Sequence, residues 1–597
     1  MKFLKKLLYL LTSKERKRAG LLIGMIIMMA LLDAAGVASI MPFMAILINP
    51  ELIETNNILN SFFIASTKFG IENNEQFLFA LGILVLLFLI ISLCFKALTT
   101  YAQLRFVQMR EYTIGKRLIE GYLRQPYSWS LNRHSAELGK SVLSEVDFIV
   151  GKGFLPLVTL IAQSAVAIAL LTLIILTDPK LALIIIFTLG TFYILIYKLT
   201  RGTLHRIGQQ RLKANQLRFT AVIECFGAIK EVKVGGLEKI YIKRFSDPSY
   251  ISALHQVSSK IISHMPRFAL EAVTFGGMML VILYLISQSG TFIKAVPIIA
   301  LYAFTGYRLM PALQQIFASI TQLRFVGPSL DAMYNDFKNL EPSQLSQDNN
   351  IIEFNKEITL NNVSFNYPNV THNVLKNVHI NIPARTVVGF AGATGSGKTT
   401  VVDIILGLLE TNQGNLKVDG LVINKNNSRA WQGSIGYVPQ HIFLADDTVA
   451  ANIAFGKDLK DIDQKAVERA SKIANLHEFV INDLPLKYLT EIGERGIRLS
   501  GGQRQRIGIA RALYHKPKVL ILDEATSALD NLTEKVVMQA IHNIGKDITI
   551  ILIAHRLSTL KKCDNIFVLE KGELKNQGTY EELIQLNENF RALNKNI

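Results

Sequence analysis

The stretch Gly392-Ala-Thr-Gly-Ser-Gly-Lys-Thr399 decides the fold of the C-terminal part of this chain. It matches a phosphate-binding loop, because it follows the apolar run Thr386–Phe390 and precedes a helix-forming run, Val401–Leu409. Glycines allow backbone N–H groups to turn toward phosphates, the lysine reaches their outer oxygens, and the hydroxyl after it can bind Mg²⁺. We expect phosphate contacts from Gly392, Ala393, Thr394, Gly395, Ser396, Gly397, Lys398, Thr399 and Thr400.

Two acids end an apolar run farther along the chain, at Asp523 and Glu524. Asp523 can hold a metal ion, and Glu524 can polarise an attacking water. A strand that ends in two acids is commonplace by itself, but behind a phosphate loop it indicates hydrolysis. Strand-like runs alternate with helical ones from Ile351 onward, which predicts an α/β domain with a largely parallel sheet.

The N-terminal half has a different composition. The chain of 597 residues is 50% hydrophobic and 19% charged, which excludes a disordered chain and indicates that about half of it lies in lipid. Of the net charge of +17, +16 belongs to the first 340 residues (35 Lys and Arg against 19 Asp and Glu). Positive flanks of membrane helices explain this excess better than a nucleic-acid partner, which we do not expect. The three cysteines are too scattered for a disulfide framework or a zinc cluster.

Six apolar stretches are long enough to cross a bilayer of about 30 Å. They are Gly20–Ile48, Phe77–Leu98, Phe154–Thr177, Leu181–Leu199, Phe268–Ser287 and Val296–Phe317. The basic segment Met1–Arg18 predicts an interfacial helix before the first span. Lys and Arg concentrate in the segments that would face the cytoplasm, so both termini are predicted to be cytoplasmic. We expect a transmembrane domain over residues 1–340 and a nucleotide-binding domain over residues 341–597.

The stretch Leu499-Ser-Gly-Gly-Gln503 resembles the signature motif of ATP-binding-cassette (ABC) ATPases. Together with the six spans, it resembles an ABC exporter half-transporter. The resemblance implies an all-α transmembrane domain of six helices followed by an α/β phosphate-loop cassette, with ATP and Mg²⁺ as cofactors. It also implies ATP hydrolysis coupled to transport, in a homodimer whose two ATP sites each combine one phosphate loop with the partner's signature.

The resemblance also assigns individual roles. It implies that Tyr367 stacks on adenine, that Gln440 senses and binds Mg²⁺ with Thr399 and Asp523, and that Glu524 and His555 are catalytic. Nucleotide contacts are implied for the signature and the D-loop, that is, for Ser500, Gly501, Gly502, Gln503 and Asp530. Tyr367 and His555, taken alone, would be ordinary packing residues. Short coupling helices are implied within Gln125–Leu138 and about Arg211–Thr220.

Three cations fall in or beside the predicted spans: Lys96, Arg267 and Arg308. A charge within the bilayer is costly unless it faces protein or water, so they could form a basic path for a pyrophosphate or another anionic headgroup. The alternatives are ordinary positive flanks, or neutralisation of Arg267 by Glu271 four residues later. Asp33 in the first span is either a partner for such a cation or a helix-packing acid.

A narrower resemblance rests on Met41-Pro-Phe43, Met265-Pro-Arg-Phe-Ala-Leu-Glu271 and Tyr307-Arg-Leu-Met-Pro-Ala312. These stretches are similar to those of the PglK-type flippases of bacterial protein glycosylation. The resemblance implies a flippase for polyprenyl-pyrophosphate-linked oligosaccharides in the bacterial inner membrane. Lys96 stands where we expect arginine, which puts its role in doubt. The alternatives are a lipid A or hydrophobic-drug exporter, or a membrane ATPase that regulates a partner.

The segment between the first two spans carries an apolar face. Its members are Ile58, Leu59, Phe62, Phe63 and Phe69. Such a helix would either lie on the outer leaflet and touch lipid tails or pack as an ordinary loop.

Overall fold

The computed structural model describes residues 2–48, 50–68, 70–71, 73–177, 179–268, 271–272, 276, 279, 283, 296–340, 351–368, 372–493, 496–525, 531–544, 547–553, 557–586 and 590. These residues form two compact units. The first comprises Met1–Gln125 and Arg133–Pro342, and the second Pro126–Asn132 and Ser343–Ile597. Each unit is described by itself.

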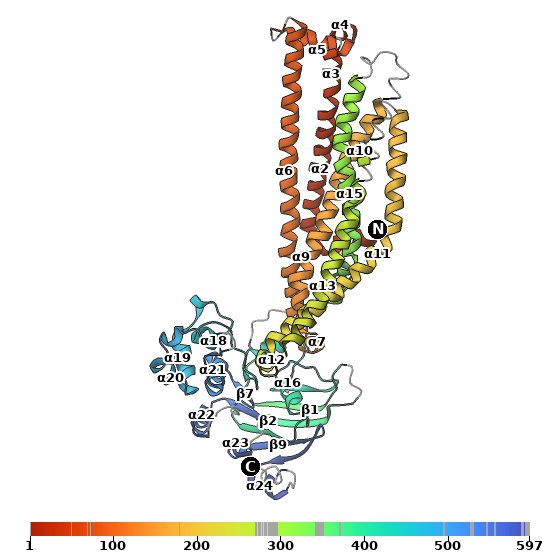
Figure 1. Ribbon diagram of the computed structural model, residues 1–597. Coiled ribbons are helices and arrows are strands. Elements are labelled where there is room, and N and C mark those ends of the chain that lie inside the picture. The colour runs from red at the N-terminus through yellow and green to blue at the C-terminus, as the bar shows by residue number, and fades with distance from the viewer. Residues whose placement is uncertain are drawn as a thin grey trace. The chain divides into compact units, whose positions relative to one another are not determined.

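The first unit is helical, as predicted (Figure 1). Its helices are α1 (Lys2–Leu10), α2 (Ser13–Ala38), α3 (Ile40–Ile48), α4 (Leu52–Thr55), α5 (Asn57–Thr67), α6 (Asn74–Leu123), α8 (Ser135–Lys140), α9 (Val146–Ile149), α10 (Leu155–Thr177), α11 (Pro179–Gly227), α12 (Ile229–Val234), α13 (Glu238–His264) and α15 (Val296–Asn339). Two π-helical turns, η1 (Ser141–Glu145) and η2 (Val150–Phe154), flank α9.

Three stretches of the described chain are long and apolar enough to span a membrane: Ser13–Leu47, Asn74–Leu123 and Ser135–Leu176. They cover the first three predicted spans except for the last residues of the first and third, Ile48 and Thr177. The predicted fourth and sixth spans lie in the continuous helices α11 and α15. Most of the predicted fifth span, Phe268–Ser287, lies outside the described residues.

The first span is two helices rather than one, because α2 ends at Ala38 and α3 begins at Ile40. The hydroxyl of Ser39 donates to the carbonyl of Gly36 at 2.8 Å. Pro42 in the first turn of α3 has no N–H to continue the hydrogen-bond ladder of α2. The sequence shows one apolar run there, and the proline explains the break.

The buried face of α6 follows a seven-residue repeat along its apolar half. Val85, Ser92 and Thr99 are all buried, at intervals of seven residues. This spacing keeps one narrow face of a long helix against its neighbours, as in coiled coils. Two of the three residues are small and polar, so the neighbouring backbone can approach closely.

The N-terminal helix α1 is amphipathic, and one of its faces packs on protein. Leu7 and Leu10 are buried in the core of the first unit, and Lys6 forms an ion pair of 2.7 Å with Asp331 on α15. Leu4 and Leu8 on another face are exposed. The exposed face is available for the predicted contact with a membrane interface, and the buried face packs α1 against the helical bundle.

The second unit contains two sheets. The antiparallel one has the order β2 (Leu375–Pro383), β1 (Glu357–Phe365), β4 (Gln413–Val418) and β5 (Leu421–Val422). The other has the order β10 (Glu573–Gly578), β9 (Asn565–Glu570), β3 (Val387–Ala391), β8 (Thr549–Ile553), β7 (Val519–Asp523) and β6 (Ile435–Val438). All of its neighbours are parallel except β10 and β9, so the prediction of a largely parallel sheet is confirmed.

The second unit also contains helices. They are α16 (Lys398–Ile405), α17 (Ser428–Gln432), α18 (Val449–Ile453), α19 (Gln464–Ile473), α20 (His477–Asn482), α21 (Gly501–Tyr514), α22 (Asn531–Ile544), α23 (Leu557–Leu560) and α24 (Tyr580–Leu586). The short α7 (Tyr127–Ser130) belongs to the same unit. Strands β3, β7 and β8 are buried along their whole length, as expected for parallel strands covered on both faces.

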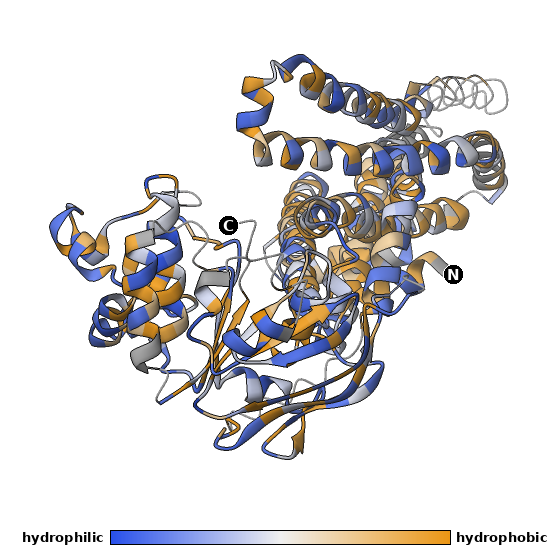
Figure 2. Cartoon of the chain, turned by 90° about the horizontal axis from the view of Figure 1, so that it is seen from below, coloured by the Kyte–Doolittle hydropathy of each residue, from blue (hydrophilic) through white to orange (hydrophobic). Residues whose placement is uncertain are grey.

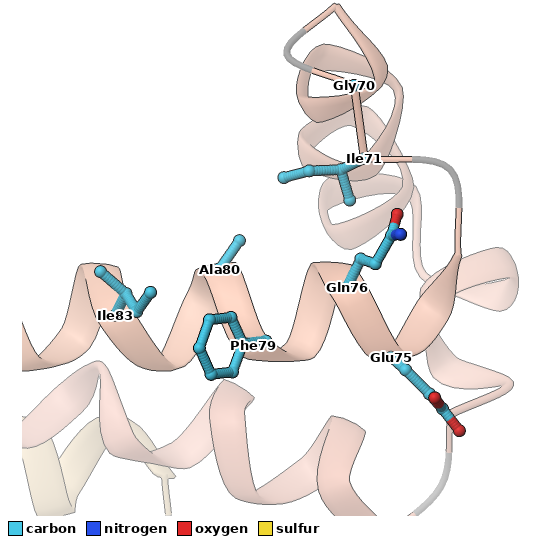
Figure 3. A pocket seen from close by; sticks show the side chains of 7 residues that line it. All are labelled: Gly70, Ile71, Glu75, Gln76, Phe79, Ala80 and Ile83. Carbon is cyan, nitrogen blue, oxygen red and sulfur yellow. The ribbon is translucent and has the colours of Figure 1, made fainter.

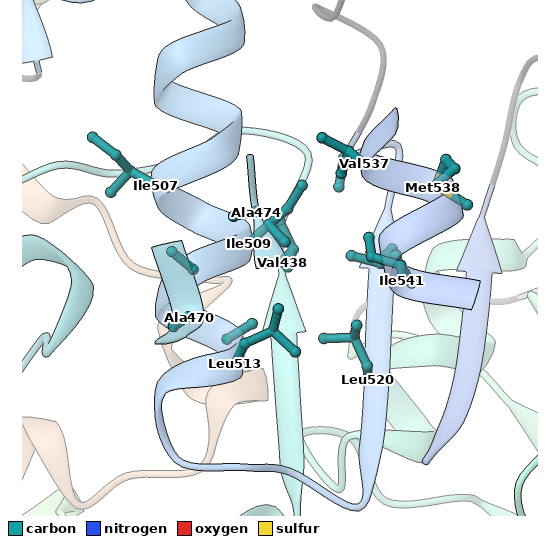
Figure 4. Packing of buried hydrophobic residues seen from close by; sticks show 14 of the residues in the cluster. Val438, Ala470, Ala474, Ile507, Ile509, Leu513, Leu520, Val537, Met538 and Ile541 are labelled. Atoms are coloured by element: carbon teal, nitrogen blue, oxygen red, sulfur yellow. The ribbon is translucent and has the colours of Figure 1, made fainter. Parts of the chain in front are cut away.

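The core of this unit joins strands and helices that are distant in sequence (Figure 4). Val438 and Leu520 of the sheet pack with Leu513 of α21 and Ile541 of α22. In Figure 2 the helices of this unit show blue and orange on different faces, which is the amphipathic pattern that such packing requires. This packing fixes the positions of α21 and α22 relative to the sheet.

Candidate functional site

Several of the predicted ATP-handling residues lie at the carboxyl ends of the parallel strands. Parallel strands end on the same side, so the segments after β3, β6 and β7 meet there. The phosphate loop follows β3, Gln440 lies two residues after β6, and Asp523 is the last residue of β7. Asp523 is paired with Ile553, the last residue of β8.

Glycines shape the phosphate loop. Gly392, Gly395 and Gly397 have φ values of 145°, 80° and 104°, which favour glycine. A Cβ at Gly392 would lie 2.3 Å from the carbonyl oxygen of Leu569, whereas a Cβ at Gly395 would meet nothing within 4 Å. The loop can therefore present its backbone N–H groups only with glycine at its base.

Lys398 begins α16 and folds back over the loop. Its Nζ donates to the carbonyls of Gly392 at 2.8 Å and Ala393 at 3.0 Å. Burial lowers the pKa of Lys398, while the charges of Glu524 and Asp523 oppose that shift. The ammonium is thus held inside the loop, facing the two acids.

Glu524, the acidic residue predicted to be catalytic, has an unusual backbone conformation. Glu524 has a φ of 49°, and its N–H donates to Ile553 at 3.0 Å. A residue with a long side chain in this left-handed region costs about 1–3 kcal/mol, and such strain clusters at functional sites. Gln440 Nε2 donates to Glu524 Oε2 at 2.8 Å, so two of the predicted site residues are in direct contact.

The loop also offers groups suited to nucleotide and metal. The Ser396 hydroxyl is buried without a hydrogen-bond partner, while Thr399 is exposed at the start of α16. Asp523 is 6% exposed, and its charge acts on Lys398, which lies between these two residues in the chain. The buried Ser396 hydroxyl lacks a partner that a phosphate oxygen could supply. The Thr399 hydroxyl and the Asp523 carboxylate are oxygen ligands of the kind that Mg²⁺ prefers. Tyr367 is half-buried, and its hydroxyl lies 3.1 Å from that of Thr400.

Asp403 on α16 is a residue that the sequence reasoning missed. It is 8% exposed, and burial followed by the negative charge of Asp523 raises its pKa to about 6. The signal was present, because a carboxylate five residues after Lys398 interrupts the apolar run Val401–Ile405.

The signature serine caps its own helix. The Ser500 hydroxyl accepts from the N–H of Gln503 at 3.2 Å, and the Gln503 side chain accepts from the N–H of Ser500 at 2.7 Å. This reciprocal capping box begins α21 at Gly501, followed by Gly502. Figure 1 shows α21 and the phosphate-loop helix α16 in different parts of the cassette. Asp530 and His555 lie outside the described residues.

One of the two predicted coupling segments is wrong. Arg211–Thr220 forms no separate short helix, because α11 continues through it to Gly227. Two of its polar residues are buried: Arg211 and Asn215 both donate to Glu145, at 2.8 and 2.7 Å. The other segment, Gln125–Leu138, does contain short helices, α7 and part of α8.

The three predicted path cations separate into two groups. Lys96 Nζ on α6 and Arg308 Nη1 on α15 both contact Asp33 on α2, at 3.2 and 2.8 Å. Arg267 pairs instead with Glu271 at 2.7 Å, and both side chains are substantially exposed. Neutralisation of Arg267 by its helical neighbour, which the spacing allowed, is thus present, and Asp33 is a cation partner.

The outer helix α5 is divided between packing and exposure. Phe63 contacts Phe77 edge to face at 5.3 Å, and Leu59 packs on the same cluster, whereas Phe62 is 64% exposed. Phe69 and the side chain of Ile58 lie outside the described residues. A shallow apolar groove of about 440 Å³ runs between Ile71 and the start of α6 (Figure 3). Packing is thus present for Phe63 and Leu59, while contact of Phe62 with lipid tails stays a prediction.

Both units resemble parts of known ABC transporters. Residues 375–527 match the ABC transporter family, and residues 52–305 match the ABC transporter transmembrane region. The chain is 30% identical over 494 residues to an ATP-dependent lipid A-core flippase of Cupriavidus pinatubonensis, covering 80% of this chain and 81% of that protein. An ATP-dependent lipid A-core flippase of Chromobacterium violaceum is 32% identical over 473 residues, or 76% of each. A solved bacterial Atm1-family ABC exporter with ATP bound shares the fold, with a TM-score of 0.75 over 97% of both chains at 22% identity.

Proposed function

Since the chain belongs to the ABC transporters and is an exporter-type half-transporter, with a transmembrane region joined to an ATPase domain, we propose that it flips a phosphate-bearing lipid across the membrane. The substrate that we propose first is a polyprenyl-pyrophosphate-linked oligosaccharide for protein glycosylation, moved from the cytoplasmic to the outer leaflet of the bacterial inner membrane. Both termini and the cassette would be cytoplasmic.

The observation that carries this proposal is the ionic cluster of Lys96, Arg308 and Asp33. Two cations and one carboxylate on spanning helices leave an excess of one positive charge in an apolar environment. Such a charge is costly, and it is retained where it meets an anionic ligand or a water-filled path. A neutral hydrophobic drug would have no use for it.

Lipid A-core is the second candidate, because two relatives with that name match three quarters or more of this chain. It also carries phosphate groups, so the cluster suits both lipids. The two candidates differ in the tail, which is one long polyprenyl chain in the first and several acyl chains in the second.

We propose a homodimer as the working form. Ser500 caps the start of α21, which lies in a different part of the cassette from the phosphate loop. The signature motif of a second copy would therefore be needed to close each ATP site. Thr399, Asp523 and Gln440 would hold Mg²⁺, which neutralises phosphate charge during hydrolysis. Lys398 would bind the outer phosphates, and Glu524 would orient the water.

The test is ATP-dependent flipping in vesicles that contain the purified protein. Fluorescent polyprenyl-pyrophosphate oligosaccharide and fluorescent lipid A-core are offered separately, with Glu524→Gln as the inactive control. Flipping of the polyprenyl lipid supports the first candidate, and flipping of lipid A-core alone supports the second. If Lys96→Ala/Arg308→Ala flips either lipid as fast as the wild type, the cationic path is wrong and a neutral cargo becomes the better hypothesis.

A further inference from the structure

Asp33 holds two cations that come from two other helices. Its Oδ2 lies 3.2 Å from Lys96 Nζ, and its Oδ1 lies 2.8 Å from Arg308 Nη1. The Ser92 hydroxyl makes a longer contact of 3.5 Å with Oδ1. The side chain of Asp33 is 2% exposed, whereas those of Lys96 and Arg308 are 37% and 24% exposed. The carboxylate is therefore enclosed, and each cation keeps an open side.

The helices fix this carboxylate in place. Gly36 lies one turn after Asp33 on the same face of α2, and a Cβ there would be 3.2 Å from Leu89 of α6. Helix α2 thus lies tightly against α6 at the level where Ser92 and Lys96 reach Asp33. A carboxylate held so rigidly is a permanent partner for the cations rather than a mobile surface group.

The cations have capacity beyond this pair. A guanidinium carries five N–H donors, and an ammonium carries three. Within the described part of the chain, Asp33 is the only carboxylate that either cation contacts. A phosphate oxygen could bind to the open side of Arg308 or Lys96 without leaving the buried carboxylate unpaired.

We propose that Asp33 is a specificity-determining residue that acts as a built-in competitor for the anionic headgroup. It rests on the proposed function, since it assumes a phosphate-bearing lipid. With Asp33 ionised, the cluster has a charge of +1, so it attracts a phosphate group but binds it weakly enough to release it. Without the carboxylate, the charge would be +2, and the headgroup would be bound more tightly and released more slowly. Asp33 therefore sets the balance between capture and release of the headgroup.

The test compares wild type, Asp33→Asn and the double variant Asp33→Asn/Lys96→Met as full-length protein in nanodiscs. Asp33→Asn keeps the shape of the side chain and removes its charge, and the double variant restores the net charge of +1. Substrate-stimulated ATPase activity is titrated with polyprenyl pyrophosphate, with polyprenyl monophosphate and with neutral polyprenol. Flipping rates in vesicles report release.

For Asp33→Asn we expect the half-stimulating concentration of polyprenyl pyrophosphate to fall about tenfold, with slower flipping and no change for polyprenol. The double variant returns both values toward wild type. An unchanged concentration dependence in Asp33→Asn, or a double variant no closer to wild type, overturns the role of Asp33 while leaving the flippase function standing. A wild-type protein that responds neither to the phosphorylated polyprenyl lipids nor to lipid A-core overturns the function itself. If Asp33→Asn does not fold, Asp33→Glu and the double variant provide the test. Asp33→Glu keeps the negative charge. If Asp33 acts as a competitor, this variant must therefore keep the wild-type preference for pyrophosphate over polyprenol.

Discussion

Arg211 on α11 donates to Glu145 on the π-helical turn η1 at 2.8 Å, and both side chains are buried. The same guanidinium lies over the ring of Phe148 at 3.5 Å and contacts Ser329 on α15 at 3.3 Å. One arginine on α11 thus contacts both the π-helical turn before α9 and the long helix α15. The network fixes the position of η1, a type of turn that is rare and frequently occurs at functional sites.

We expect Arg211→Met to destabilise the first unit by about 3–5 kcal/mol, because it leaves the Glu145 carboxylate buried without a cation. The double variant Arg211→Met/Glu145→Met should recover much of this loss. Thermal unfolding of the purified protein in nanodiscs measures both. Lys233→Met is the control, because the pair of Lys233 and Glu238 is exposed and should not matter. A single variant as stable as the wild type would show that the pair contributes nothing.

Replacement of the strained acid at the end of β7 should separate ATP binding from hydrolysis. Glu524→Gln keeps the size of the side chain but cannot accept a proton from water, so we expect ATPase activity to fall about 10²- to 10⁴-fold. Nucleotide binding, followed with a fluorescent ATP analogue, should persist. Loss of binding together with turnover would instead indicate that Glu524 supports the structure of the site.

Two glycines of the phosphate loop should respond differently to the same methyl group. Gly392→Ala would place a Cβ 2.3 Å from a backbone carbonyl, so ATP binding should be lost. Gly395→Ala has open space, so it should cost only its unfavourable φ, about 1 kcal/mol, and reduce binding modestly. ATP affinity measured by titration compares them. Equal losses would mean that backbone conformation, not the close approach to Leu569, governs the loop.

Asp403 should make the stability of the cassette depend on pH. Burial and Asp523 raise its pKa from 3.8 to about 6, so between these values the folded protein holds a proton that the unfolded chain releases. The contribution of this group to stability therefore falls as the pH rises from about 4 to 6. We expect Asp403→Asn to gain up to about 3 kcal/mol relative to wild type across that window. Thermal unfolding followed by the fluorescence of the buried Trp431 in nucleotide-free protein measures the difference, and a constant offset between pH 4.5 and 7 would contradict it.

Neighbouring phenylalanines of α5 should separate packing from lipid contact. Phe63→Ser removes the contact with Phe77 and should lower the unfolding temperature, whereas Phe62→Ser should leave it unchanged. If the exposed ring touches lipid tails, Phe62→Ser should slow the flipping of long-tailed substrates more than that of short-tailed ones. An equal effect on substrates of every tail length would assign Phe62 to the protein itself.

The sequence by itself determined the cassette and the helical nature of the first unit. The phosphate loop, the acids after β7 and the capping box of α21 are local patterns, so their chemistry and their backbone geometry are encoded within a few residues of each other. The first three spans follow equally from apolar length alone. The break at Ser39 was less visible, because a proline inside an apolar run changes hydropathy very little.

Only the tertiary structure decided which charges meet. Arg308 and Asp33 are 275 residues apart, and Glu145 and Arg211 are 66 apart, so no spacing rule relates them. The sequence placed Lys96, Arg267 and Arg308 in one basic path, yet two of them share a carboxylate and the third pairs with its own helical neighbour. Which charged residues of a helix reach a partner depends on how the helix is rotated against its neighbours. Tertiary packing sets that rotation.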